Sequence, residues 1–150
     1  MLPESIIRYC HYQPRCHQEV RNKLFELGYS KEDVENYISE LIGNDLLNEE
    51  RYARAIARGK FRIKKWGRIK IIQQLRQNRI SEYCIKKGLS EIDANEYFDT
   101  AKRLAQKRVE EKKLNNKEIK NNIYKYLIQK GYEPNIIIEI INDIINKEVN

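Results

Sequence analysis

Apolar residues recur along this chain at intervals of three and four positions, and strict alternation of β-branched and polar residues is hard to find. Intervals of three and four place apolar side chains on one face of an α-helix. The 150 residues include only six glycines and three prolines, so few positions interrupt such helices. The pattern therefore predicts an all-α protein.

The apolar pattern returns three times along the chain. Leu24, Leu75 and Leu127 lie 51 and 52 residues apart, and aligning them brings four further apolar positions into register. These positions are Val20, Ile71 and Ile123; Tyr29, Ile80 and Tyr132; Val34, Ile85 and Ile137; and Leu41, Ile92 and Ile144. Each unit then reads as a helix, a short turn and a second helix, which indicates a repeat protein.

A further helix is expected before the helix pair of each unit. It is long in the second and third units, at about 49–65 and 96–113, and short in the first, at about 5–12. We therefore predict tandem three-helix repeats, three in number with the first truncated, and we assign them to residues 1–47, 48–94 and 95–150. Single units of this size bury their apolar faces poorly alone, so we expect them to stack into an elongated, curved array.

The predicted turns carry helix-capping residues. Ser30 and Ser81 each stand where a hydroxyl would cap the second helix of a pair. Gly28 and Gly131 stand just past the preceding helix, where a left-handed residue commonly ends it. The middle unit has Arg79 at that position, which departs from the pattern and carries a local energetic cost.

The C-terminal segment 132–150 is rich in isoleucine. Pro134 suits the first turn of a helix. One apolar face of that helix is predicted to comprise Ile137, Ile140, Ile141 and Ile144. We expect this face to cover the preceding helix and close the third repeat, which leaves a monomer; the alternative is an oligomer contact.

Positive charge is concentrated in the middle of the chain. The whole chain carries +7, but residues 1–47 carry −3, residues 48–90 carry +10 and residues 91–150 carry zero. Thirteen cations against three anions in the middle segment exceed what an ordinary solvated helix face carries. Such a concentration favours a polyanionic partner, because neutralising phosphates releases counterions.

The helix predicted from residue 49 separates its cations from its apolar residues. The cations Arg51, Arg54, Arg58, Arg62 and Lys65 follow helical intervals and line one face. The apolar stripe predicted to point inward is Tyr52, Ala53, Ile56, Ala57 and Ile63. This helix therefore presents its charges together, on a scaffold that suits a phosphate backbone or an acidic protein groove.

The segment KFRIKKWGRIK, residues 60–70, joins this helix to the next. The candidate contact residues across both helices and their junction are Arg51, Arg54, Arg58, Lys60, Arg62, Lys64, Lys65, Trp66, Arg68, Lys70 and Arg76. Trp66 has two interpretations, a platform on which a base of single-stranded nucleic acid stacks and a hinge packed between helices. We favour the hinge, because Trp66 ends the apolar stripe.

The sequence gives little support for a metal site or an enzyme active site. Cys10, His11, Cys16 and His17 are zinc-binding types, but neighbouring side chains on a helix diverge by about 100°, which disfavours one tetrahedral site. No phosphate-binding glycine loop and no GxSxG serine elbow occurs. Tyr83 and Tyr97 are less constrained than the tyrosines at repeat positions and are candidates for exposure. We therefore expect no enzyme, no metal and no cofactor.

The cellular compartment is inferred from weaker features of the sequence. No apolar run approaches the length of a membrane span, and the N-terminus MLPESIIRYC lacks the pattern of a signal peptide. Three cysteines, an odd number, fit a reducing compartment. We expect a cytoplasmic protein without a membrane contact.

The run LLNEERYARAIARGKFRIKKWGRIKIIQQLRQNRIS, residues 46–81, resembles the signature of the RecX family of bacterial recombination regulators. The matching features are Leu47, Asn48, Glu49, Glu50, the pair Tyr52 and Ala53, the basic helix, Gly67, Leu75 and Ile80. The segment QPRCHQEVRNKLFELGYS, residues 13–30, is similar to the first-repeat segment of that family. The resemblance is good over about residues 9–90 and rests mainly on spacing afterwards.

The resemblance implies an all-α regulatory protein with roles in DNA repair, DNA recombination and the SOS response. Such a protein binds the RecA filament on single-stranded DNA, lodges in its helical groove and inhibits RecA recombinase and coprotease activity without chemistry of its own. The alternative from the residues alone is a general nucleic-acid-binding helical-repeat module without a RecA partner.

Overall fold

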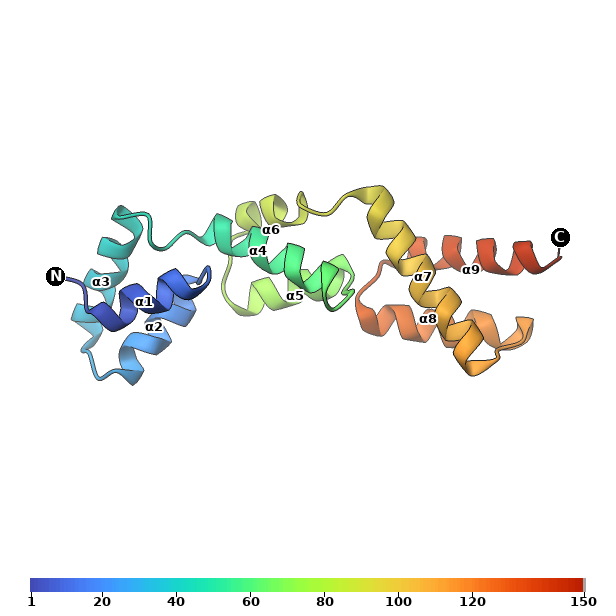
Figure 1. Cartoon of the computed structure of the whole chain (residues 1–150), viewed down its shortest axis with the longest axis horizontal. Helices are drawn as coiled ribbons and strands as arrows, with labels where there is room; N and C mark the ends of the chain where they lie inside the picture. Colours follow the sequence, from blue (N-terminus) through green and yellow to red (C-terminus); the bar gives the residue numbers. More distant parts are fainter. Residues whose placement is uncertain (150) are drawn as a thin grey trace. The chain divides into compact units, whose positions relative to one another are not determined.

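The computed structural model describes residues 1–149, which form nine α-helices and no strand (Figure 1). Asn150, the last residue of the predicted third repeat, lies outside the described residues. The helices are α1 (Glu4–Tyr12), α2 (His17–Glu26), α3 (Lys31–Gly43), α4 (Glu49–Arg62), α5 (Arg68–Gln77), α6 (Glu82–Leu89), α7 (Ala94–Lys112), α8 (Asn116–Lys130) and α9 (Pro134–Val149). The prediction of an all-α protein is confirmed.

The helices follow the predicted order of three tandem three-helix repeats. The first helix of each repeat has 9 residues in α1, 14 in α4 and 19 in α7, so the first repeat is the truncated one. Helix α4 ends at Arg62, whereas the sequence predicted a helix reaching Lys65. Lys65 instead has a left-handed backbone, with φ of 60°, and belongs to the turn before α5.

The three aligned leucines share one backbone motif. Leu24, Leu75 and Leu127 are fully buried, and each carbonyl accepts a hydrogen bond from the N–H five residues later, at 3.2, 3.0 and 3.0 Å. The residue before each donor has a left-handed backbone: Gly28 at φ 95°, Arg79 at 60° and Gly131 at 99°. This is the hydrogen-bond pattern of a Schellman motif. Arg79 therefore adopts the conformation that glycine adopts in the other two repeats.

The predicted hydroxyl caps are present. Ser30 Oγ accepts a hydrogen bond from Asp33 N–H at 3.2 Å, and Ser81 Oγ accepts one from Cys84 N–H at 3.2 Å. Each bond satisfies a donor that the first turn of a helix leaves without an intrahelical partner. The local sequence therefore determines where α3 and α6 begin.

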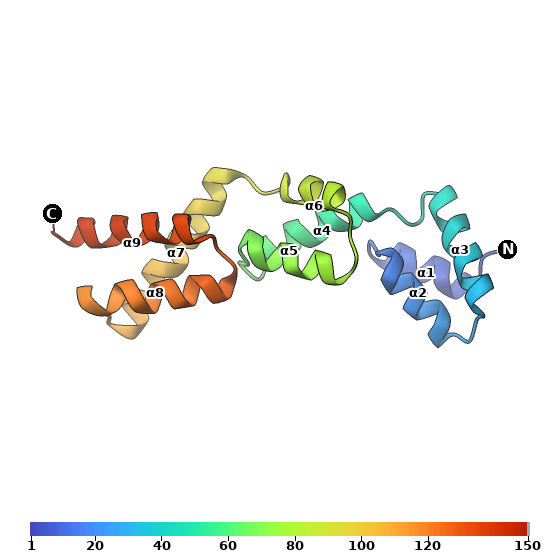
Figure 2. The same ribbon diagram turned by 180° about the vertical axis from the view of Figure 1, so that it is seen from behind.

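The chain forms two compact units whose limits fall inside helices. The first unit combines Met1–Ile56 with Gln74–Ser90, and the second combines Ala57–Gln73 with the chain from Glu91 onward. Helices α4 and α5 therefore each contribute residues to both units (Figures 1 and 2). The turn between α4 and α5 belongs entirely to the second unit.

Each unit has its own apolar core. In the first unit, Ile6, Val20, Leu24, Val34, Ile38 and Leu41 pack together from α1, α2 and α3. In the second unit, the rings of Phe61, Tyr97 and Tyr132 contact in series, with centroid distances of 5.8 and 5.0 Å. The predicted inward face of α9 is buried, with Ile137, Ile140, Ile141 and Ile144 all at most 6% exposed.

The predicted apolar stripe of α4 is wrong at one end. Ile63 is 81% exposed, whereas Phe61 is 3% exposed and takes the inward position. The reason is the helical period, because Ala53, Ala57 and Phe61 lie four residues apart on one face while Ile63 lies beyond the end of the helix.

None of the helices in residues 1–149 combines the length and the apolar content that crossing a lipid bilayer requires.

Candidate functional site

Most arginines of the predicted basic surface are engaged with acidic residues. On α4, Arg51 contacts Asp45 at 3.4 Å, Arg54 contacts Glu50 at 3.3 Å and Arg58 contacts Glu91 at 3.5 Å. On α5, Arg68 contacts Glu133 at 2.8 Å and Arg76 contacts Glu82 at 2.9 Å. We call these five the paired arginines. Part of the positive charge counted in the sequence is therefore neutralised by local acids.

Arg76 forms two hydrogen bonds with one exposed carboxylate. Its Nε and Nη2 donate to the two carboxylate oxygens of Glu82 at 2.9 and 3.2 Å. These hydrogen bonds lower the pKa of Glu82 below its ordinary value. Both side chains are more than 60% exposed, at 61% and 71%, so water screens the pair and its contribution to stability is small.

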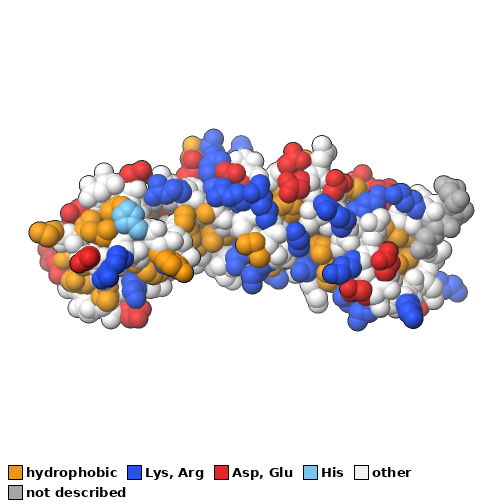
Figure 3. Space-filling view, in the orientation of Figure 1, with side chains coloured by type: hydrophobic (Ala, Val, Ile, Leu, Met, Phe, Trp, Pro, Cys, Tyr) orange, Lys and Arg blue, Asp and Glu red, His pale blue; other side chains and the backbone are white. Residues whose placement is uncertain are grey.

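Five cations around the end of α4 have no acidic partner within residues 1–149: Lys60, Arg62, Lys64, Lys65 and Lys70. Together with Trp66 we call them the basic turn. Lys60 Nζ and Lys70 Nζ lie 4.8 and 4.7 Å from the centre of the Trp66 ring, a distance at which an ammonium group is attracted to an indole. Figure 3 shows Lys and Arg side chains gathered over the segment of α4, α5 and α6.

The basic turn is held in place by the third repeat. Gly67 N–H, just before α5, donates to Lys130 O at 2.8 Å, and Ile69 N–H donates to Gly131 O, just after α8, at 2.9 Å, so the start of α5 is capped by the end of α8. Tyr132 Oη donates to Lys65 O at 2.7 Å. A side chain at Gly67 would not fit, because a Cβ there would lie 2.3 Å from the carbonyl carbon of Gly131. The turn is therefore a pinned loop on a helical scaffold.

Sequence reasoning missed a polar cluster beneath the basic turn. Tyr97, expected to be a candidate for exposure, is 1% exposed. Its hydroxyl accepts a hydrogen bond from Arg68 N–H at 2.8 Å and donates one to Glu133. The Arg68 guanidinium lies 3.9 Å from the centre of the Tyr97 ring, and burial raises the pKa of this tyrosine. Arg68 thus holds two repeats together, and no local signal identifies partners 29 and 65 residues away.

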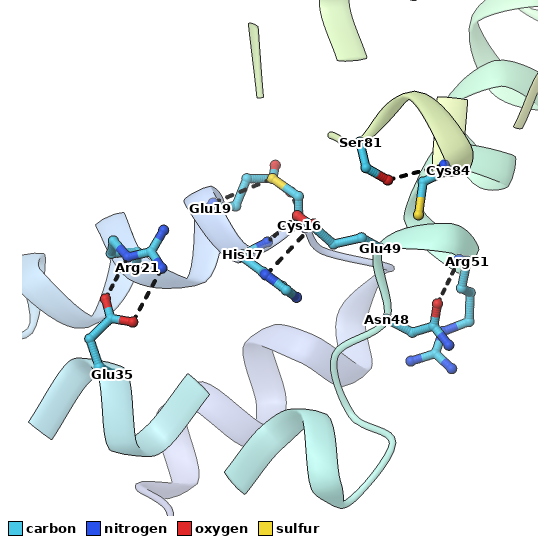
Figure 4. A network of polar contacts seen from close by, with 10 residues as sticks. All are labelled: Cys16, His17, Glu19, Arg21, Glu35, Asn48, Glu49, Arg51, Ser81 and Cys84. Carbon is cyan, nitrogen blue, oxygen red and sulfur yellow. Dashed lines mark hydrogen bonds and ion pairs between the residues drawn. The ribbon is translucent and has the colours of Figure 1, made fainter. Parts of the chain in front are cut away.

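Cys16 and His17 make separate contacts with acidic residues near the start of α2 (Figure 4). Cys16 is fully buried and caps α2, with Sγ accepting a hydrogen bond from Glu19 N–H at 3.4 Å. Burial raises the pKa of the Cys16 thiol to about 11. His17 donates its backbone N–H to Glu49 at 3.0 Å, and Cys10 belongs to the first core. Within residues 1–149 no three His, Cys, Asp or Glu side chains are grouped closely enough to hold a metal ion.

Comparison with known proteins matches two segments of the chain to family models. Residues 48–89 match the second three-helix domain of RecX, and residues 95–141 match its third three-helix domain. These segments contain the basic turn and all the groups that pin it.

Similar curated proteins carry the name regulatory protein RecX. The relative from Clostridium perfringens strain 13 is 30% identical over 134 residues, which are 87% of this chain and 62% of that protein. The relative from Clostridium botulinum strain Eklund 17B is 28% identical over 149 residues, which are 97% of this chain and 69% of that protein. The chain thus spans less than two thirds of the length of the first relative.

A solved structure agrees with this relationship. The crystal structure of RecX from Lactobacillus salivarius superposes with a TM-score of 0.83 at 25% identity, over 93% of this chain and 91% of that one. Family models, relatives and fold agree, and the resemblance seen in residues 46–81 is confirmed: the chain belongs to the RecX family of regulatory proteins.

Proposed function

We propose that this chain is a non-enzymatic regulator that binds the RecA filament on single-stranded DNA and inhibits RecA recombinase and coprotease activity. Membership of a family whose members are named regulatory proteins supports a regulatory role. The observation that carries the contact is the basic turn, which collects five cations without acidic partners within the described residues on the pinned loop between α4 and α5 and on the helix ends beside it. A regulator of this kind acts as a monomer in the cytoplasm.

The basic turn suits a polyanion better than the paired arginines do. A cation already bound to a carboxylate must lose that charged contact before it binds a phosphate. In the basic turn, Lys65 Nζ and Lys70 Nζ instead donate to neutral backbone oxygens, those of Arg62 at 2.8 Å and Gln129 at 3.5 Å, and such contacts are weaker than an ion pair. The turn also enters the complex preformed, since backbone hydrogen bonds to Lys130 and Gly131 hold it, so little conformational entropy is lost on binding. We therefore place the main contact at the basic turn and give the paired arginines a structural role.

The test is the effect of the purified chain on the ATP hydrolysis of RecA that depends on single-stranded DNA. The unaltered chain is expected to inhibit hydrolysis when added well below one molecule per RecA. The charge-reversal variant Lys60→Glu, Arg62→Glu, Lys64→Glu is expected to weaken inhibition by about a hundredfold, because it replaces three phosphate contacts with repulsion. Its circular dichroism is expected to match that of the parent.

A matched control reverses the same amount of charge on α8. Lys117, Lys120 and Lys125 are exposed and make no ion pair within the described residues, so their replacement by Glu is expected to leave inhibition within about threefold of the parent. Equal loss in both variants would mean that only net charge matters. If the parent binds bare single-stranded DNA but leaves RecA unaffected, the chain is a general nucleic-acid-binding module and the RecA assignment is wrong.

A further inference from the structure

Trp66, the one tryptophan of the sequence, is shared by two lysines of the basic turn. Lys60 Nζ, from the last turn of α4, lies 4.8 Å from the centre of its ring, and Lys70 Nζ, from the first turn of α5, lies 4.7 Å from it. Both lysines and Trp66 are half-buried, whereas the other three cations of the basic turn are exposed. The ring therefore gathers two ammonium groups from two different helices.

The two ammonium groups need an attraction to stay together. Because both distances are measured to one ring centre, the groups are no more than about 10 Å apart, roughly one Debye length, and they repel each other. A lysine side chain also has many rotamers to lose. Lys70 Nζ has one further contact, to Gln129 O at 3.5 Å, which is long for a hydrogen bond. The attraction of a cation to the face of an indole opposes both costs.

The backbone holds the ring in place. Trp66 N–H donates to Lys60 O at 3.1 Å, and the next amide, that of Gly67, donates to Lys130 O at 2.8 Å. The backbone is thus anchored at Trp66 itself and at the residue after it, once to α4 and once to the end of α8. The lysines are therefore positioned by a side chain whose own position is fixed before any partner binds.

A ring orders a cation without neutralising it. A carboxylate both positions an arginine and cancels its charge, as Glu133 does for Arg68 at 2.8 Å. An indole ring carries no net charge, and a lysine ammonium has three N–H donors. The ammonium groups of Lys60 and Lys70 therefore keep their charge, and keep donors that can bind an anionic oxygen. Trp66 gives these lysines the order of the paired arginines without their neutralisation.

We propose that Trp66 is a positioning residue, which holds Lys60 and Lys70 together in the free protein so that both bind the polyanionic partner at once. The rotamer entropy of two lysines is then lost on folding and not on binding, which strengthens the complex without adding a charge. This role differs from a base-stacking platform and from a hinge, because the ring acts through the two lysines. The inference deepens the proposed function and rests on it for the identity of the partner.

The test is a mutant cycle measured on the inhibition of RecA ATP hydrolysis by the full chain. Trp66→Leu is expected to weaken inhibition about fivefold, and Trp66→Phe, which keeps a ring, is expected to stay within about twofold of the parent. Lys60→Gln, Lys70→Gln is expected to weaken inhibition about tenfold. Adding Trp66→Leu to that pair is expected to cause no further loss, because the ring then has no lysine to position.

A loss of about fiftyfold in the triple variant would overturn the inference, since a tryptophan that stacks on a base or only supports the fold acts independently of the lysines. Tyr83→Leu is the matched control. Lys87 Nζ lies 5.5 Å from the Tyr83 ring, outside the basic turn, so the same kind of change there is expected to leave inhibition unaltered.

A second measurement needs no partner. In the NMR spectrum of the free protein, the ring current of Trp66 is expected to shift the Cε protons of Lys60 and Lys70 upfield of those of Lys64, for which no ring contact is seen within the described residues. Trp66→Leu is expected to remove this shift. Equal shifts for all three lysines in the parent would overturn the inference, whether or not RecA is inhibited.

The two proposals can fail separately. If the parent leaves RecA unaffected, the same cycle is measured by fluorescence anisotropy with a labelled oligothymidylate. No further loss on adding Trp66→Leu to the lysine pair would then support the positioning role while the RecA proposal fails. Independent losses on the oligothymidylate would overturn the positioning role as well.

Discussion

Both ends of α5 carry cations in the sequence, but the two ends have different surroundings in the structure. At its N-terminal end, the amides of Gly67 and Ile69 are capped by the end of α8, and Lys65 and Lys70 have no acidic partner within the described residues. At its C-terminal end, Arg76 is paired with the exposed Glu82. The basic turn at one end of this short helix therefore has cations without acidic partners within the described residues, whereas Arg76 at the other end is paired with Glu82.

The difference shows that the density of cations in a sequence does not identify a binding surface. A cation is available to a ligand when no carboxylate lies within reach, and that depends on which helices pack together. It also shows that rigidity can come from elsewhere in the chain, since the basic turn of the second repeat is held by hydrogen bonds from the third. Three substitutions test this contrast.

The largest effect is expected at Gly67. In Gly67→Ala the new Cβ would lie 2.3 Å from the backbone of Gly131, so the end of α5 must separate from α8 and lose its capping hydrogen bonds. We expect the free energy of unfolding to fall by about 3 kcal/mol, measured by urea denaturation.

Gly59→Ala is the matched control for this substitution. A Cβ at Gly59 has no neighbour within 4 Å and lies inside α4, so alanine there is expected to stabilise the protein by about 0.5–1 kcal/mol. Similar stabilities for both variants would show that the basic turn is not pinned by α8.

A smaller effect is expected from Tyr97→Phe. Removing the hydroxyl leaves the Arg68 amide and the Glu133 carboxylate without a shared partner, and we expect a loss of about 1–3 kcal/mol in the same denaturation assay. Tyr83→Phe, at a tyrosine that is 63% exposed, is expected to change stability by no more than about 0.5 kcal/mol. If Tyr97→Phe lowers the free energy of unfolding no more than Tyr83→Phe does, the hydrogen bonds of Tyr97 do not help to hold the basic turn.

The smallest effect, and of opposite sign, is expected at the C-terminal end of α5. Arg79→Gly places glycine at a left-handed residue with φ of 60°, and we expect a stabilisation of about 1 kcal/mol by thermal denaturation. Gly28→Ala at the equivalent position of the first repeat, where φ is 95°, is expected to destabilise by a similar amount. Shifts of the same sign in both variants would contradict the shared motif.

Much of the fold could be predicted because its determinants are local. Intervals of three and four residues fix the inward face of each helix, as Ile137 and Ile141 illustrate. Ser30 and Ser81 mark helix starts, because each hydroxyl accepts a hydrogen bond from the N–H three residues later. The alignment of three leucines found the repeat because each must end its helix in the same hydrogen-bonded turn. Errors occurred at helix ends, where Ile63 and Lys65 were placed in α4.

The candidate site was only partly predictable. The sequence identified the basic segment and Trp66, since charge and residue type can be read directly. It could not separate the paired arginines from the basic turn, because Arg58 and Arg68 find their acids 33 and 65 residues away. Nor could it indicate Tyr97, whose burial comes from the packing of α7.

The amino-acid sequence by itself determined the helices, the repeat, the concentration of positive charge and the resemblance to the RecX family. Only the tertiary structure decided which cations remain without acidic partners within the described residues and which turn is pinned by the third repeat. The physical reason is range, since helix period and capping act over a few residues, whereas ion pairing and burial depend on residues that are distant along the chain and close in space.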